Sequence, residues 1–212
     1  MIYICKGKEP NTLKRYRKQP YAYFDGCNKD DIRQSLLEEQ GYLCAYCMRR
    51  IDKEQMKIEH WYPEYLLSEQ QRLEYHNMLG VCIGHIEGQK GRDDTCDSHK
   101  QNTIITVNPC EPKMISEIQY KSKSGEIYSE NPVIQKDINE TLNLNSIAHR
   151  LPQNRKHKLN AVIQELSRKL PQGKWTKSRL ENIIKLYSKP DSTGKKAEYI
   201  GIVLWYLNKK IG

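Results

Sequence analysis

The chain has 212 residues, of which 35 are Lys or Arg and 26 are Asp or Glu, so its formal net charge is +9. A hydrophobic fraction of 37% indicates a globular protein, which excludes a wholly disordered one, and the length suits one domain with an appended region. No apolar run approaches the roughly 18 residues that a membrane-spanning helix needs, whereas the positive charge favours a polyanionic partner, most commonly nucleic acid.

Cysteine usage points to a metal site. The seven cysteines are an odd number, and Cys44 and Cys47 stand as Cys-x-x-Cys. The first residues, Met-Ile-Tyr-Ile-Cys-Lys, contain no apolar signal core. We therefore expect a cytoplasmic, reduced protein with a metal site, in preference to a framework of disulfides.

Residues 1–28 are predicted to form a basic and aromatic arm. Pro10 and Pro20 break any regular element, which favours an extended conformation. The arm could hold phosphates and stack bases, or it could equally pack on the surface of the domain. Its charged and aromatic residues are Lys14, Arg15, Tyr16, Arg17, Lys18, Tyr21, Tyr23 and Phe24.

Residues 29–112 are predicted to form the core of the protein. A short helix runs from Asp30 to Gly41, since aspartate caps a helix start and glycine ends one. Residues 57–60 read as a strand that Pro63 stops, and residues 77–82 read as a turn and a second strand. Residues 64–75 have helix-forming composition and connect the two, and a short helix begins near Asp97.

Four cysteines of this core are our candidates for a structural zinc site. Cys-x-x-Cys spacing lets two thiolates reach one ion, and a tetrahedral site needs two further ligands. Cys82 and Cys96 are the preferred partners of Cys44 and Cys47. His85 is the alternative to Cys96, because Cys82-Ile-Gly-His85 also has the spacing of a zinc knuckle.

Glu59 and His60 form the candidate catalytic pair. A carboxylate can hold a hard cation, and the imidazole beside it can serve as a general base for hydrolysis of a phosphodiester. Asp97 or His99 is expected to complete the metal site. Asp97 is preferred, because it shares a helical face with Lys100, a candidate phosphate contact.

Asn77 is expected to fasten the loop that orients His60, because an asparagine amide can bond backbone groups; the alternative is an ordinary turn residue.

Residues 113–212 are predicted to hold a hairpin and then helices. Ile115–Tyr120 and Glu126–Tyr128 read as paired strands. Apolar residues at helical spacing predict helices over Arg155–Lys169, Thr176–Tyr187 and Glu198–Asn208, with Pro171 and Gly173 separating the first two. The expected fold class is α+β, a small two-strand and helix core stapled by zinc and followed by a helical region that docks a partner.

These motifs resemble those of a known nuclease family. Four segments of this chain are together similar to the HNH motif of that family. They are Cys44-x-x-Cys47, Ile58-Glu59-His60-Trp61-x-Pro63, Asn77-Met78-Leu79-x-x-Cys82 and Cys96-Asp97-x-x-Lys100. More narrowly, these segments and Thr141-Leu-Asn-Leu-Asn145 resemble PtuB, the HNH subunit of Septu antiphage systems that also occurs in some retron operons. The resemblance extends to about Arg150, and Asp97 stands where many HNH enzymes carry His or Asn.

The resemblance implies a ββα-metal fold and specific roles. His60 would be the general base, Glu59 and Asp97 would hold a catalytic Mg²⁺ or Mn²⁺, and Asn77 would be the middle residue of the motif. The implied partners are a PtuA-like ATPase, a DNA or RNA substrate and, in a retron, a reverse transcriptase with its msDNA.

We therefore expect an endonuclease that acts in antiphage defence under control of the ATPase. The alternatives are a zinc-knuckle module that binds nucleic acid without cutting it, and a toxin-like ribonuclease acting on RNA such as tRNA.

Overall fold

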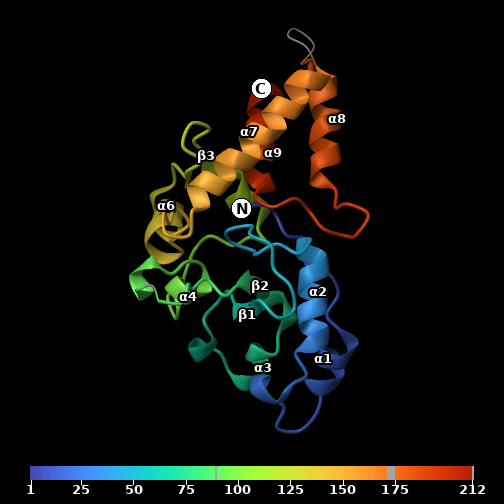
Figure 1. Ribbon diagram of the computed structural model, residues 1–212. Coiled ribbons are helices and arrows are strands. Elements are labelled where there is room, and N and C mark those ends of the chain that lie inside the picture. Colours follow the sequence, from blue (N-terminus) through green and yellow to red (C-terminus); the bar gives the residue numbers. More distant parts are fainter. Residues whose placement is uncertain (89, 171–174, 212) are drawn as a thin grey trace.

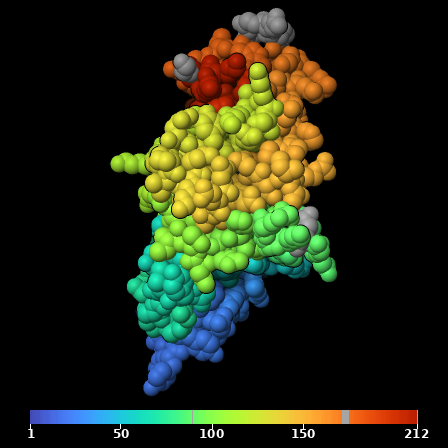
Figure 2. All heavy atoms as spheres, turned by 90° about the vertical axis from the view of Figure 1, so that its left-hand side faces the viewer, coloured from blue at the N-terminus to red at the C-terminus, as the bar shows by residue number. Residues whose placement is uncertain are grey.

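The computed structural model describes residues 1–88, 90–170 and 175–211 of an elongated α+β protein (Figures 1 and 2). N-terminal segments lie at one end of the molecule, the C-terminal helices lie at the other, and both small sheets lie between them. The helices of the first two thirds are short: α1 (Asn11–Tyr16), α2 (Asp30–Gln40), α3 (Glu69–Arg72), α4 (Asp97–Lys100), α5 (Pro112–Ser116) and α6 (Pro132–Lys136), the last continued by a π-helical turn over Asp137–Thr141.

The first sheet is a pair of antiparallel strands, β1 (Met56–His60) and β2 (Met78–Cys82). The register pairs Met56 with Cys82 and His60 with Met78. Cys82 therefore lies at one end of the sheet and His60 lies at the other. Both strands were predicted, and both are confirmed.

Helix α2 is attached to β2 through a side-chain amide as well as through apolar contact. Ile32, Leu36 and Leu37 are buried, as expected, and Gly41 ends the helix with a left-handed φ of 65°. The Gln40 side chain accepts a hydrogen bond from the Gly80 N–H (2.7 Å) and donates one to the Gly80 carbonyl (2.7 Å). The predicted helix is confirmed, and its last residue bonds to the backbone of β2.

The N-terminal segment is not an extended arm. It contains α1 and a 3-10 turn over Phe24–Gly26, and Leu13 and Phe24 are buried against the core. The prediction failed because the apolar residues scattered between the basic ones find partners on the core. The packed alternative describes this segment, although Tyr21 is fully exposed.

Two other element predictions were wrong in extent. The connector over residues 64–75 forms only a 3-10 turn (Glu64–Leu66) and the four-residue α3, which Ser68 and Gln71 cap. The predicted hairpin is reduced to β3 (Gln119–Tyr120) and β4 (Ile127–Tyr128), because Ile115 and Ser116 belong to α5, which begins at Pro112.

The C-terminal helices were predicted well. α7 (Leu151–Lys169), α8 (Lys177–Ser188) and α9 (Ile200–Ile211) pack together, with α9 against both α7 and α8. Each predicted stripe has buried residues, including Leu159, Leu180 and Leu207, although the rest of the stripe on α8 is only partly buried. The predicted break at Pro171 and Gly173 lies outside the described residues. Over the described ranges, we find no helix with the length and apolar character needed to cross a membrane.

A buried arginine joins α7 to the preceding segments. Arg155 donates hydrogen bonds to the carbonyls of Gly125 (2.7 Å) and Leu144 (2.8 Å) and to the side-chain oxygen of Asn145 (2.9 Å). Leu142, just before this segment, accepts a hydrogen bond from the Cys96 N–H (2.9 Å). The segment around Leu144 thus connects the helical region to the cysteine-bearing core.

Candidate active site and metal centre

The four cysteines predicted as ligands lie together and come from three separate segments of the chain. Cys44 and Cys47 belong to a tight loop in which the Cys44 N–H bonds to the Arg49 carbonyl (2.8 Å) and the Met48 N–H bonds to the Cys44 carbonyl (3.0 Å). Cys82 ends β2, and Cys96 precedes α4 with a left-handed φ of 57°. These loops have little secondary structure of their own around the thiols.

The geometry of the four thiols suits a tetrahedral ion. All four are buried, and their sulfur atoms lie within 4.8 Å of one another. The Cys44 and Cys96 sulfurs are 3.8 Å apart, and those of Cys47 and Cys82 are 3.7 Å apart. A zinc–sulfur bond of about 2.3 Å gives tetrahedral sulfur–sulfur edges of about 3.8 Å. The group could therefore hold a metal ion such as zinc.

The position of His85 supports the same reading. Without an ion, hydrogen bonds from the neighbouring thiols lower the pKa of Cys47 well below its usual range, while hydrogen bonds within the group raise the pKa of Cys82 and burial raises that of Cys96. A bound metal ion would have to displace the remaining protons. His85 lies outside the group, half-exposed, with its Nδ1 2.7 Å from an Asp94 carboxylate oxygen. Of the two alternatives for the fourth ligand, Cys96 is the one that lies with the other three.

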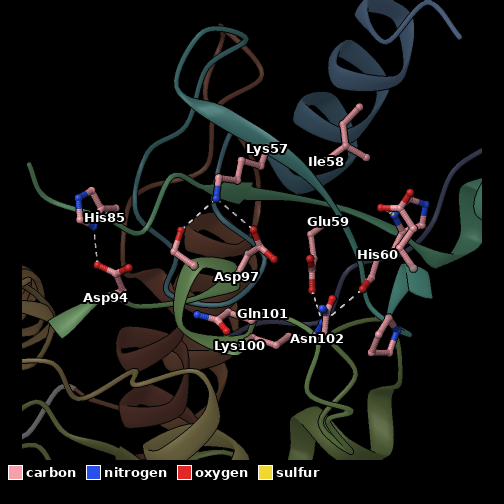
Figure 3. A pocket seen from close by; sticks show the side chains of 13 residues that line it. Lys57, Ile58, Glu59, His60, His85, Asp94, Asp97, Lys100, Gln101 and Asn102 are labelled. Atoms are coloured by element: carbon pink, nitrogen blue, oxygen red, sulfur yellow. Dashed lines mark hydrogen bonds and ion pairs between the residues drawn. The ribbon is translucent and has the colours of Figure 1, made fainter. Parts of the chain in front are cut away.

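A cavity of about 480 Å³ is lined in part by Asp97 and Ser98, which directly follow Cys96 in the chain (Figure 3). Its walls come from β1, the loop after it, the segment around His85 and Asp94, and α4 with the residues that follow it. Polar and charged side chains dominate the lining. They include Lys57, Glu59, His60, Glu64, His85, Asp94, Asp97, Ser98, Lys100, Gln101 and Asn102.

Two carboxylates face each other in this cavity. Glu59 is buried, and its burial together with the neighbouring Asp97 carboxylate raises the pKa of Glu59 to about 9. Asp97 is partly exposed and lies 3.3 Å from the Lys57 ammonium group. Paired carboxylates that repel each other are a donor set that a hard divalent cation would stabilise. The residues present therefore fit a Mg²⁺ or Mn²⁺ ion.

Lys100 is placed differently from the phosphate contact that we expected. Its side chain is 1% exposed, and its Nζ lies 2.7 Å from the Glu59 Oε1 and 3.4 Å from the His60 carbonyl oxygen. Its positive charge favours the ionised form of Glu59, against the effect of burial and of Asp97. Lys57 is the lysine on the more open side, with its side chain 45% exposed.

The His60 ring is held in one orientation. Nε2 lies 2.7 Å from the Arg72 carbonyl oxygen, which can only accept, so Nε2 carries the proton and Nδ1 keeps its lone pair. Phe24 packs edge-on against the ring at 4.7 Å between centroids. Burial lowers the pKa of His60, so the ring is neutral near pH 7. A neutral, oriented imidazole has the properties of a general base.

Asn77 lies where the loop after His60 turns. Its side-chain amide donates to the Tyr62 carbonyl (3.0 Å) and accepts from the Tyr62 N–H (2.8 Å), and its own carbonyl accepts from the Trp61 N–H (2.9 Å). These contacts fix the two residues that follow His60. Asn77 thus fastens this loop, and its role in orienting His60 stays a prediction.

His99 points away from the cavity, because its Nδ1 lies 3.0 Å from the Thr141 carbonyl. Asp97 is thus the residue of the two that reaches the site.

Sequence reasoning missed three side chains around the site: Lys57, Phe24 and the acidic partner of His85. Strand alternation could have placed Lys57 on the face of Glu59, two residues away. No spacing signal links Phe24 to His60, or His85 to Asp94, because chain folding brings them together.

Comparison with known proteins gives a relative that is similar to part of this chain. No protein-family profile matches the sequence. A protein of Vibrio cholerae serotype O1 biovar El Tor, named as the candidate HNH endonuclease of retron Vc95, is 27% identical over 124 residues. The match covers 53% of this chain and 58% of the relative, so it spans little more than half of each.

Proposed function

We propose that this protein is a metal-dependent endonuclease of the HNH type, in which β1, β2 and α4 form the ββα-metal core. The observation that carries the proposal is the convergence of His60, Glu59 and Asp97 on one cavity, in a chain that also holds the four-cysteine group. The name of the distant Vibrio cholerae relative supports the same chemistry.

In this proposal His60 removes a proton from the attacking water through Nδ1. The Arg72 carbonyl and Phe24 hold the ring, so little reorganisation is needed when the proton is taken. A divalent ion bound by Glu59 and Asp97 would supply charge stabilisation at the phosphate and at the leaving oxygen. Lys100 balances part of the buried negative charge, and Asn77 keeps His60 in position.

The four cysteines would bind a structural zinc ion. Cys82 ends β2 and Cys96 begins α4, so the ion would fix the angle between the strand pair and the short helix. That angle places Asp97 opposite Glu59. The structural metal would therefore position the catalytic carboxylates without taking part in the reaction.

The biological setting that we propose is antiphage defence of the Septu or retron type. The retron named for the relative supports this setting. A PtuA-like ATPase would control the nuclease, and in a retron a reverse transcriptase and its msDNA would be further partners. These partners rest on the motif resemblance described above.

Cleavage assays on plasmid DNA and total RNA test the proposal. The wild-type chain, with the neighbouring operon's ATPase and Mg²⁺ or Mn²⁺, should cut one of the two polymers, and His60→Ala should lower the rate by about 10²-fold or more. His76→Ala is the matched control, because His76 is an exposed histidine on the loop before β2 and should leave the rate unchanged.

The outcomes separate the proposed activity from its rivals. Cleavage confined to RNA would favour a toxin-like ribonuclease. Zinc binding with nucleic-acid binding and no cutting under any condition would leave a zinc-knuckle binding module, for which His60 is dispensable.

A further inference from the structure

The positive charge of this protein is not spread over its length. Residues 29–112, which contain the cavity, have ten Lys and Arg against 15 Asp and Glu, a formal charge of −5. Residues 113–150 are neutral, with five of each, and residues 1–28 carry six basic and two acidic residues. Residues 151–212 have 14 Lys and Arg against four Asp and Glu, a formal charge of +10.

The charge of the C-terminal helices is concentrated where three helix ends meet. α7 ends, α8 begins and α9 ends at the extremity of the molecule farthest from α1 (Figures 1 and 2). All six basic side chains at these ends are exposed. Among the described residues nearby the carboxylates are Glu165, which pairs with Lys169 at 2.6 Å, and Glu181. We call this group the distal basic end: Arg168, Lys169, Lys177, Arg179, Lys209 and Lys210.

Helix stability explains only part of this arrangement. Basic residues in the last turn of α7 and α9 interact favourably with the negative end of the helix dipole. Lys177 lies instead in the first turn of α8, which has no acidic residue and where the dipole disfavours a cation. Like charges gathered at one end of the molecule also repel one another. A bound polyanion would relieve both costs.

Aromatic rings accompany the cations of α9. The Lys209 ammonium lies 5.3 Å from the centre of the Trp205 ring, and that of Lys210 lies 5.5 Å from the centre of the Tyr206 ring. Both rings are half-buried. These contacts direct the two ammonium groups along the surface of the helix end, where a phosphate backbone could reach them.

We propose that the distal basic end is a nucleic-acid-binding surface, separate from the catalytic cavity, that contacts the phosphate backbone without reading its sequence. This deepens and rests on the proposed function, because it names the surface that holds the substrate. Residues 29–112, with a formal charge of −5, attract a polyanion far less than the C-terminal helices do. Most of the binding energy then comes from the distal basic end.

Fluorescence anisotropy of the full chain tests this surface. The probes are a short labelled DNA duplex and a labelled single-stranded RNA, titrated at several salt concentrations in a His60→Ala background so that the probe stays intact. The test variant carries Arg168→Gln, Lys177→Gln and Lys210→Gln. The matched control carries Lys53→Gln, Lys113→Gln and Lys123→Gln, three exposed lysines of residues 29–150.

The inference predicts that the test variant binds its preferred probe at least about tenfold more weakly, and that the slope of log K against log salt falls by about 2 to 3 for three lost contacts. The control should stay within roughly twofold of the parent. Circular dichroism and zinc content should be unchanged in both variants, because every substituted side chain is exposed.

Equal affinity of the test variant and the parent would overturn the inference. So would a variant that loses binding to polyglutamate but keeps its affinity for nucleic acid, since the surface would then suit an acidic protein. A chain that binds through the distal basic end and never cuts would refute the proposed nuclease alone. A chain that cuts while its distal variant binds as tightly as the parent would refute this inference alone.

Discussion

The cysteine-bearing core and the C-terminal helices of this protein are held together by different forces. The core consists of two five-residue strands and a four-residue helix, joined by loops that converge on four thiols. The C-terminal region consists of helices of 19, 12 and 12 residues, of which α7 and α9 each bury several apolar side chains and α8 buries Leu180. The candidate chemistry lies entirely in the first region.

Strands and helices as short as those of the core are not stable on their own. A two-stranded sheet is marginal in water, and a single helical turn does not repay its nucleation. Ligand binding can supply the missing stability, and it also places the reactive groups accurately. The long helices have no such need, so their surface is free to carry an unbalanced charge. In the core, stability and the candidate chemistry thus depend on the same loops, whereas the C-terminal helices contribute stability without candidate catalytic residues.

Removal of the metal should have the largest effect, because it should destabilise the cysteine-bearing core and leave the C-terminal helices folded. Binding of structural zinc contributes on the order of 10 kcal/mol to folding of small sites. We expect a strong chelator, or Cys44→Ser with Cys96→Ser, to unfold β1, β2 and α4 while α7, α8 and α9 stay helical. Amide hydrogen exchange measures this region by region. Cys5→Ser, at an exposed cysteine outside the group, is the control, and persistent protection of β1 in the apoprotein would contradict the idea.

A substitution that creates a cavity among the C-terminal helices should destabilise those helices and leave the four-cysteine group unchanged. Leu207 is fully buried in α9, so Leu207→Ala should lower the free energy of unfolding by about 2 to 5 kcal/mol. The zinc content per folded chain should not change. Leu186→Ala removes the same atoms from a side chain that is 70% exposed and should change stability by about 0.5 kcal/mol or less. Loss of zinc in the Leu207 variant would mean that the two regions are coupled.

Arg155 lies at the connection between the two regions. Arg155→Met leaves the carbonyls of Gly125 and Leu144 without a donor, which should cost about 2 to 3 kcal/mol. Urea denaturation measures the change, with Lys156→Met as the exposed neighbour for control. If the arginine connects the regions, a zinc-sensitive probe and a helix-sensitive probe should separate into two transitions in the variant. A single transition at the parent midpoint would argue against that role.

The smallest expected effect on stability concerns Asn77. Asn77→Ala removes both amide bonds to Tyr62 and should cost about 1 to 2 kcal/mol. Its effect on cleavage should be larger, because the loop that follows His60 loses its anchor while the four thiols are untouched. Zinc content and cleavage rate measured together distinguish positioning from folding, and Asn160→Ala on the exposed face of α7 is the control. An unchanged rate would remove Asn77 from the site.

The sequence predicted the elements that depend on residues close together in the chain. The helices of the C-terminal region follow from apolar spacing, and the end of α2 follows from Gly41. The four-cysteine set was predicted from spacing, because a tetrahedral ion limits which thiols can meet. Burial of Lys100, by contrast, depends on Glu59, which is far from it in sequence. The packing of Phe24 on His60 also has no sequence signal, since an aromatic residue in a basic segment is compatible with several roles.

The hydrogen bond from the Cys96 N–H to the Leu142 carbonyl has a consequence for the timing of synthesis. Cys96 holds a left-handed backbone conformation that costs energy, and its N–H is satisfied by a residue made much later on the ribosome. Arg155, which bonds the Leu144 carbonyl, is made later still. A nascent chain therefore presents Cys44, Cys47 and Cys82 before the contacts that hold the backbone at Cys96 can form. We expect the segment around the fourth thiol to reach its final conformation only after the start of α7 has been synthesised.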